Sequence, residues 1–245
     1  MIKKVEGIIV STVNYKENSK IINILTKENG IIGVLAKGSR KLKSNISATS
    51  NILTYGTFYL NIKNRGLANL TEVDIINNFK QIKKDLVKLN YATYLLELSS
   101  QVYRHDNNNE IYELLISGLT KINENYDAES ISLIIELKLL DYLGIKPIID
   151  KCVCCGSSND IVTISSYKGG YLCKNCINNE KVFNIKTLKL IRMFSYVNLN
   201  KVTKLDISNN IKRELNLFVD DYYDRYSGLY LKSKTFLNEY SLLQK

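Results

Sequence analysis

Two closely spaced cysteine pairs are the feature that most constrains how this 245-residue chain folds. Cys152 and Cys155 are followed, after 17 intervening residues, by Cys173 and Cys176. This matches a C-x2-C, gap, C-x2-C zinc pattern, in which the gap is about 15 to 20 residues. Each pair can hold two thiolates on one side of a tight turn, and two such turns complete the tetrahedral sulfur shell of Zn²⁺. Because four thiolates leave no open position for a substrate, the pattern predicts one structural zinc ion per chain.

The fifth cysteine, Cys154, has a poor spacing to Cys152 for such a turn. We interpret it as a bystander, and the alternative is that it replaces a neighbouring ligand. Unmetallated buried cysteines are the simpler alternative for the whole group.

Glu6 and Gly7 interrupt the first apolar run, so no signal peptide is expected. We expect a cytoplasmic protein, in which paired thiols more often bind metal than form disulfides.

The first 78 residues are expected to form β-structure. Five short runs rich in β-branched or aromatic residues are separated by Asn, Gly and Ser, as strands are. These runs are 5–10, 21–26, 31–36, 53–62 and 67–73. Five strands in this length fit a small closed barrel, and the OB-type barrel is the one that most often binds nucleic acid. An SH3-like barrel is the structural alternative.

The apolar spacing changes to a helical period at about residue 79. The expected helices begin with the segment from 79 and continue with 110–122, 129–143, 185–197 and 211–226. Gly144 and Pro147, the only proline, end the third of these. The predicted fold is therefore α+β and multidomain. It has a five-stranded OB-type β-barrel at 1–78, a helical domain at 79–150 and 180–245, and an inserted four-cysteine zinc module at 151–179.

Positive charge is concentrated at the two ends of the chain. The formal net charge is +10, and residues 1–80 carry 12 basic and 5 acidic side chains. Residues 181–245 carry 12 basic and 6 acidic side chains, whereas residues 81–150 carry 7 and 11. A cytoplasmic protein with this balance usually has a polyanionic partner, and nucleic acid is the first expectation. Solubility alone is the alternative explanation.

The segment from Asn29 to Thr71 contains no acidic residue. Its six basic residues are the candidate DNA-binding side chains. They are Lys37, Arg40, Lys41, Lys43, Lys63 and Arg65. The first four lie within seven residues around Gly38 and Ser39, and such a loop can present cations to phosphates.

Residues 186–204 suggest a second basic surface. Its members are Lys186, Lys189, Arg192, Lys201 and Lys204. It could bind a second strand or an acidic protein tail, and an ordinary solvated face is the alternative.

No catalytic constellation is evident in the sequence. His105 is the only histidine, which leaves little for a hydrolytic triad. Asp220, Asp221 and Asp224 share one expected helix and fit a solvated acidic face better than a metal cluster. The sequence also lacks a phosphate-binding P-loop. We therefore expect a non-enzymatic protein, and the alternative is a zinc-ribbon nucleic-acid-processing enzyme that captures its substrate with the OB domain.

Several short segments carry a family resemblance that spans the chain in order. At the N-terminus they read VEGIIV from Val5, YKENSK from Tyr15, LTKENG from Leu25 and AKGSRKLKS from Ala36. Later matches are 66–67, 70–72, the cysteine turns at 152–156 and 169–176, and the ending at 231–233 and 236–237. Together they resemble the RecO family of bacterial DNA repair and recombination proteins.

The resemblance implies an OB domain, a helical body and a zinc module in a DNA-binding protein. It also implies binding of single- and double-stranded DNA, annealing of complementary strands, and help for RecA in displacing single-strand binding protein. The implied partners are RecR and the acidic C-terminal tail of single-strand binding protein. The extra Cys154 departs from the family's cysteine pattern, which bears on the exact zinc ligation.

Overall fold

The computed structural model describes residues 2–41, 43–62 and 66–243. The chain divides into two compact units, one of Met1–Asn125 with Leu231–Lys245 and the other of Tyr126–Tyr230. Two units neither separate the barrel from the helices nor set the cysteine module apart, so the three-part domain division stays a prediction. Within the described ranges, no helix has the length and apolar character needed to cross a membrane.

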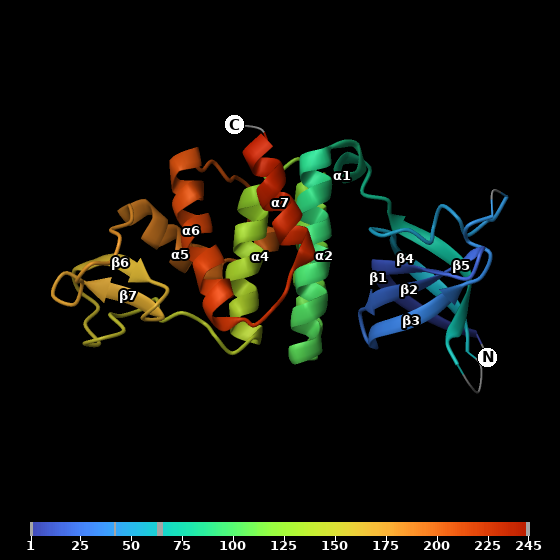
Figure 1. Cartoon of the computed structure of the whole chain (residues 1–245), viewed down its shortest axis with the longest axis horizontal. Coiled ribbons are helices and arrows are strands. Elements are labelled where there is room, and N and C mark those ends of the chain that lie inside the picture. The colour runs from blue at the N-terminus through green and yellow to red at the C-terminus, as the bar shows by residue number, and fades with distance from the viewer. Residues whose placement is uncertain (1, 42, 63–65, 244–245) are drawn as a thin grey trace. The chain divides into compact units, whose positions relative to one another are not determined.

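The first unit begins with a five-stranded closed barrel (Figure 1). Its strands are β1 (Ile2–Tyr15), β2 (Ser19–Thr26), β3 (Gly30–Ala36), β4 (Tyr55–Asn61) and β5 (Ala68–Asn77). The strand order around the barrel is β1-β2-β3-β5-β4, and β3 pairs with β5 in parallel. This Greek-key closure is the topology of the OB-fold, so the predicted OB-type barrel is confirmed.

Alternating apolar side chains fill the barrel. Ile22, Ile24, Val34 and Phe58 are fully buried in its core. β1 is longer than its neighbours, and its pairing with β2 shifts at a bulge between Ile9 and Ser11. β4 pairs with β1 only as far as Ile8, after which Ile9 bonds to loop residues.

Four helices complete the first unit. They are α1 (Lys80–Lys84), α2 (Leu86–His105), α3 (Asn109–Asn123) and α7 (Lys232–Leu243). The helical segment expected from residue 79 is divided at Asp85, whose carboxylate accepts from the backbone N–H groups of Val87 at 2.9 Å and Lys88 at 3.1 Å. Such a side-chain cap begins a new helix, here α2. The last helix, α7, was not among the predicted elements.

A shared carboxylate joins the barrel to the helices. Glu6 of β1 accepts hydrogen bonds from the Tyr55 hydroxyl at 2.9 Å and the Tyr112 hydroxyl of α3 at 3.1 Å. Burial is the largest cause that raises the pKa of Tyr112 above its usual range, and the neighbouring Tyr55 and Glu6 raise it further. Tyr112 therefore stays a neutral hydrogen-bond donor, and the contact holds α3 against the barrel.

The second unit consists of three longer helices and a β-hairpin. Its elements are α4 (Ala128–Tyr142), β6 (Ile161–Ser165), β7 (Gly170–Cys173), α5 (Ile185–Tyr196) and α6 (Asn209–Tyr226). α4 is buried along most of its length and packs against α5 and α6. The predicted helices 129–143, 185–197 and 211–226 are thus confirmed to within two residues at each end.

Asp127 begins α4 and ties it to α6, which makes it a testable stability determinant. Its carboxylate accepts from the Ser130 backbone at 3.0 Å and lies 3.2 Å from the Lys212 ammonium. Asp127→Ala is expected to lower the free energy of unfolding by about 1 kcal/mol, because the N-terminal backbone donors lose their cap. Asp127→Asn should recover most of that loss, since Asn also caps. Urea denaturation of both variants measures this, and equal losses would contradict the capping role.

The same carboxylate predicts a pH dependence. Although burial opposes ionisation, hydrogen bonds from Ser130 and the Lys212 charge lower the pKa of Asp127. A carboxyl group with a lowered folded-state pKa stabilises the fold above its unfolded pKa, and this contribution is lost as the pH falls through the folded value. The stability difference between the wild type and Asp127→Asn should therefore shrink in acid.

Candidate metal centre and nucleic-acid interface

The first cysteine pair lies in a tight turn. Cys152 is buried, and its backbone N–H donates to the Ser157 carbonyl at 2.7 Å. The N–H of Gly156 donates back to the Cys152 carbonyl at 2.9 Å. Gly156 has a φ of 76°, a left-handed conformation that glycine adopts at little cost. The Cys-x2-Cys-Gly order therefore follows from the shape of the turn.

The second pair begins where β7 ends. The Cys176 N–H donates to the Cys173 carbonyl at 3.0 Å, which closes the second turn. The Val153 N–H donates to the Tyr171 carbonyl at 2.8 Å and so holds the first turn against β7. Gly170 lets the segment before the first turn pack against β7, since a Cβ there would lie 2.3 Å from the Ile148 carbonyl oxygen.

These turns bring all four predicted ligands together. The Sγ atoms of Cys152, Cys155, Cys173 and Cys176 all lie within 4.8 Å of one another, and those of Cys155 and Cys173 are 3.6 Å apart. A tetrahedral shell with zinc–sulfur bonds of about 2.3 Å separates its sulfurs by about 3.8 Å. Cys154 is exposed and outside this group. The four thiols can therefore hold a metal ion.

The electrostatics of the cluster also suit a cation. Although burial opposes ionisation, hydrogen bonds from backbone N–H groups lower the pKa of Cys152 to about 6. In contrast, the neighbouring sulfur atoms of Cys155 and Cys173 accept from the Cys176 thiol and raise its pKa. Four adjacent thiolates repel one another, so a bound cation is what would keep all of them ionised.

Four of the predicted DNA-binding residues lie together on the loop between β3 and β4. Lys37, Arg40, Lys41 and Lys43 are all exposed there; we call this segment, residues 37–43, the basic loop. Lys63 and Arg65 lie outside the described residues.

The basic loop is attached to the turn between β1 and β2. The Arg40 backbone donates to the Asn18 carbonyl at 3.1 Å, and its guanidinium Nη1 donates to the Glu17 carbonyl at 3.1 Å. The Gly38 N–H donates to the Ser19 hydroxyl at 3.1 Å. The β1–β2 turn and the β2–β3 face form the part of OB-folds that binds oligonucleotides. The cations of the basic loop therefore lie at the edge of the barrel face that binds oligonucleotides in OB-folds.

The five residues of the expected second basic surface are all exposed in the second unit. Lys186, Lys189 and Arg192 belong to α5, and Lys201 and Lys204 follow it. Arg192 also pairs with Asp150 at 3.0 Å.

An apolar component of this surface was missed in the sequence. Lys189 and Arg192 line a pocket together with Met193, Tyr196 and Val197. Met193 and Tyr196 are 47% and 52% exposed, although Met is a residue type that is usually buried. Their position off the buried face of α5 is the signal that helical periodicity could have supplied.

The residues considered for catalysis are not brought together. His105 is exposed at the end of α2, and Asp221 accepts from its neighbour Arg225 at 2.9 Å and from Ser166. Across residues 2–41, 43–62 and 66–243, the four cysteines are the one group of three or more His, Cys, Asp or Glu side chains placed to hold a metal ion.

Comparison with known proteins covers nearly the whole chain. The family model for the Recombination protein O N terminal matches residues 1–79, and that for the Recombination protein O C terminal matches residues 83–235. A DNA repair protein RecO of Bacillus pumilus is 36% identical over 249 residues, which cover 100% of this chain and 97% of the relative. The DNA repair protein RecO of Halalkalibacterium halodurans is 34% identical over 98% of this chain and 95% of its own length. That of Listeria monocytogenes serotype 4b is 36% identical over 97% of this chain and 94% of its own length. The chain therefore belongs to the RecO family of DNA repair proteins.

Proposed function

We propose that the chain is a recombination mediator that acts by binding and annealing DNA, without covalent chemistry. It binds single- and double-stranded DNA, anneals complementary strands and, with RecR, helps RecA load onto DNA coated by single-strand binding protein. The observation that carries the proposal is the basic loop. Its cations are exposed, and the backbone N–H groups of Gly38 and Arg40 attach the loop beside the β1–β2 turn at the rim of an OB-type barrel.

The basic loop is suited to contacts with phosphates rather than base edges. Its cations are accompanied by Gly38 and Ser39, and no Asn or Gln that could read adenine lies among them. Phosphate contacts carry no sequence information and are available in both strand forms. Binding through this loop would therefore be independent of sequence and sensitive to salt.

The exposed cations on and after α5 supply the second surface that annealing requires. Two cationic surfaces on one protein screen the repulsion between complementary strands and raise their local concentration. The pocket beside Lys189 and Arg192 adds the apolar side chains of Met193 and Tyr196. Cations next to an apolar pocket suit an acidic peptide with a hydrophobic residue, so this is where we place the tail of single-strand binding protein.

We also propose that the four-cysteine cluster binds Zn²⁺ as a structural ion. Cys152, Cys155, Cys173 and Cys176 would fill the coordination shell and leave no site for water or substrate. Its contribution would be to hold the β6–β7 hairpin in place. A zinc-ribbon enzyme would need further catalytic groups and an open metal position, which four thiolate ligands do not leave.

The test is annealing of complementary strands coated with single-strand binding protein. The wild type is expected to anneal them, while Lys186→Glu/Lys189→Glu on α5 should bind naked DNA but anneal coated strands about tenfold more slowly. Lys80→Glu/Lys84→Glu makes the same charge change at exposed positions of α1, which belong to neither α5 nor the cysteine turns, and serves as the control. Equal rates for both variants would remove the second surface from the mechanism.

The same reaction mixtures test the enzymatic alternative. Reproducible cleavage or modification of labelled DNA or RNA with Mg²⁺ or Mn²⁺ would overturn a mediator that acts by binding alone. Failure of the wild type to anneal would do the same.

A further inference from the structure

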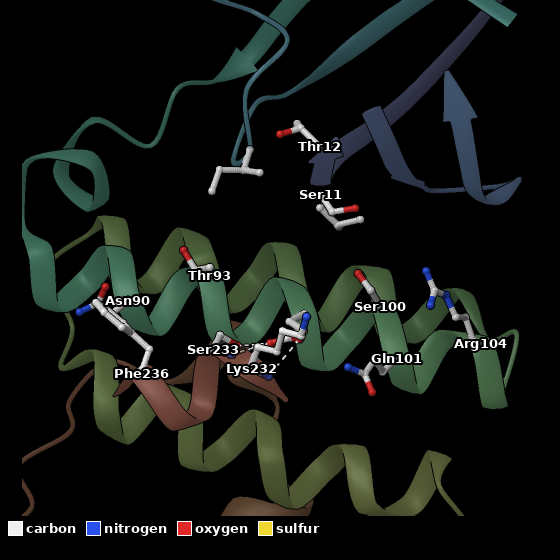
Figure 2. A pocket seen from close by; sticks show the side chains of 13 residues that line it. Ser11, Thr12, Asn90, Thr93, Ser100, Gln101, Arg104, Lys232, Ser233 and Phe236 are labelled. Carbon is white, nitrogen blue, oxygen red and sulfur yellow. Dashed lines mark hydrogen bonds between the residues drawn. The ribbon is translucent and has the colours of Figure 1, made fainter. Parts of the chain in front are cut away.

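A groove in the first unit runs between β1 and α2, with the start of α7 along its side (Figure 2). Ser11 and Thr12 of β1 hang over α2, and Thr93 and Ser100 point from α2 toward the barrel. The floor is a single stripe of α2 at helical spacing. Its members are Asn90, Thr93, Glu97, Ser100 and Arg104. All five are polar, which is unusual for the face of a helix turned toward its neighbour.

The groove is elongated along α2. Asn90 and Arg104 mark its two ends in Figure 2, and 14 residues of α-helix separate them by about 21 Å. A stacked strand of nucleic acid rises about 3.4 Å per nucleotide, so the groove could hold about six nucleotides at most. An elongated ligand fits this shape better than a compact small molecule.

The charge of the groove is positive. Arg104 and Lys232 are exposed, and neither forms an ion pair within the described part of the chain. Glu97 is the one acid among the lining residues. Its carboxylate accepts from the backbone N–H groups of Lys232 at 3.2 Å and Ser233 at 2.8 Å, and from the Ser233 hydroxyl. The start of α7 thus compensates the Glu97 charge and leaves the two cations available for an anion.

The polar lining includes hydrogen-bonding groups and an aromatic ring. The Thr93 and Ser100 hydroxyls donate to the Leu89 and Leu96 carbonyls at 2.8 and 2.6 Å, so toward the groove they offer acceptors. The Asn90 Nδ2 is a buried donor without a hydrogen-bond partner among the described residues. Phe236 of α7 lines the same groove and is 56% exposed. Cations combined with an exposed ring are the elements that bind single strands without sequence preference.

The barrel wall of the groove continues onto the face that OB-folds use for nucleic acid. The Ser11 hydroxyl accepts from the Asn23 Nδ2 of β2 at 2.9 Å, and Asn23 lies opposite Gly33 of β3 in the sheet. β1 pairs with β2 along one edge and with β4 along the other, but the pairing with β4 stops at Ile8. No β-strand of the described chain therefore covers that second edge at Ser11 and Thr12. A single strand of DNA on the β2–β3 face could pass over β1 there and enter the groove.

We propose that this groove binds a segment of single-stranded DNA that extends beyond the barrel, with Arg104 and Lys232 at its phosphates and Phe236 stacked on a base. The inference rests on the proposed DNA-binding function and adds a site to it. An acidic protein segment is the competing occupant. A polar floor and continuity with the OB face favour DNA, because peptide grooves generally bury apolar anchor side chains in pockets.

Fluorescence anisotropy of the full chain with labelled oligo-dT of about 20 nucleotides, longer than one OB-fold covers, tests the site. Arg104→Gln/Lys232→Gln should weaken binding about tenfold at low salt and lower the salt slope by about 1.4. Lys80→Gln/Lys84→Gln removes the same charge from exposed positions of α1 outside the groove, and should bind like the wild type. Phe236→Ala should weaken binding at least fivefold, about the lower limit for losing one stacked base, and Phe236→Tyr should restore it. Wild-type affinity for oligo-dT in both Arg104→Gln/Lys232→Gln and Phe236→Ala would overturn the proposal that the groove binds DNA.

Photocrosslinking of the wild type to oligo-dT carrying 5-iododeoxyuridine requires no substitution. Crosslinks in the α7 peptide at Phe236 are expected, and crosslinks confined to the barrel would overturn the inference. If the wild type binds no oligonucleotide, the proposed function itself fails; if binding depends on the basic loop and not on the groove, only this inference fails. Groove variants that retain oligo-dT but lose a polyglutamate peptide would assign the groove to an acidic protein segment instead.

Discussion

Cys173→Ser or Cys176→Ser is expected to abolish metal binding and unfold the β6–β7 hairpin. The strands are short, five residues in β6 and four in β7, and a two-stranded hairpin is marginally stable in water. The buried residues of the core cluster around the hairpin are Cys152, Leu172 and Cys173, so two of its three side chains are metal ligands. Structural zinc sites contribute on the order of 10 to 16 kcal/mol of binding free energy at neutral pH, and this energy is coupled to folding.

Elemental analysis and thermal unfolding of the purified variants measure this effect. The wild type should contain one zinc per chain, and each of the four ligand variants should contain none and unfold at lower temperature. Cys154→Ser is the matched control, because Cys154 is exposed and outside the cluster, and it should retain the metal. Full zinc content in Cys155→Ser with none in Cys154→Ser would show that the ligand had been assigned to the wrong cysteine.

Replacing all four cations of the basic loop by Ala should weaken DNA binding for all sequences alike. The four are Lys37, Arg40, Lys41 and Lys43. Each phosphate contact contributes about 0.7 to the log–log salt slope on single strands and about 0.9 on duplex. Loss of all four should therefore lower the single-strand slope by about 2.8. Titrations at several salt concentrations, on two unrelated sequences, measure both the slope and the lack of sequence preference.

A control for this variant removes four charges elsewhere. Lys80, Lys83, Lys84 and Arg213 are exposed and outside the basic loop and the cysteine turns, and replacing all four by Ala gives the control the same net charge. Its salt slope should stay close to that of the wild type. Unchanged binding by the basic-loop variant at low salt would place the DNA site elsewhere, with the α5 surface as the first candidate.

Features set by local chemistry could be predicted from the sequence. Cysteine spacing is enough to indicate two metal-binding turns, because the ligands of each turn lie three residues apart in the chain. Strands and helices differ in the period of their buried residues, which is why five strands and the main helices were found. The division at Asp85 was missed, although an Asp at this position is a recognised cap signal.

No sequence pattern within a few residues predicted the α7 helix or the groove. α7 packs against α2, and its first turn is held by Glu97, which is 136 residues from Ser233 in the chain. The polar stripe on α2 reads in the sequence as an ordinary solvated face. That the stripe lies beneath β1 is evident only once the barrel and the helices are packed together.

By itself, then, the sequence determined the OB-type barrel, the helical remainder and the identity of the four clustered cysteines, since each follows from spacings within a few residues. Tertiary structure decided how the two cysteine turns meet, where the basic loop is attached, and that α2, α7 and β1 enclose one groove. Those arrangements depend on contacts between distant segments, and such contacts form only when the burial of side chains throughout a unit offsets the entropy lost in closing long loops.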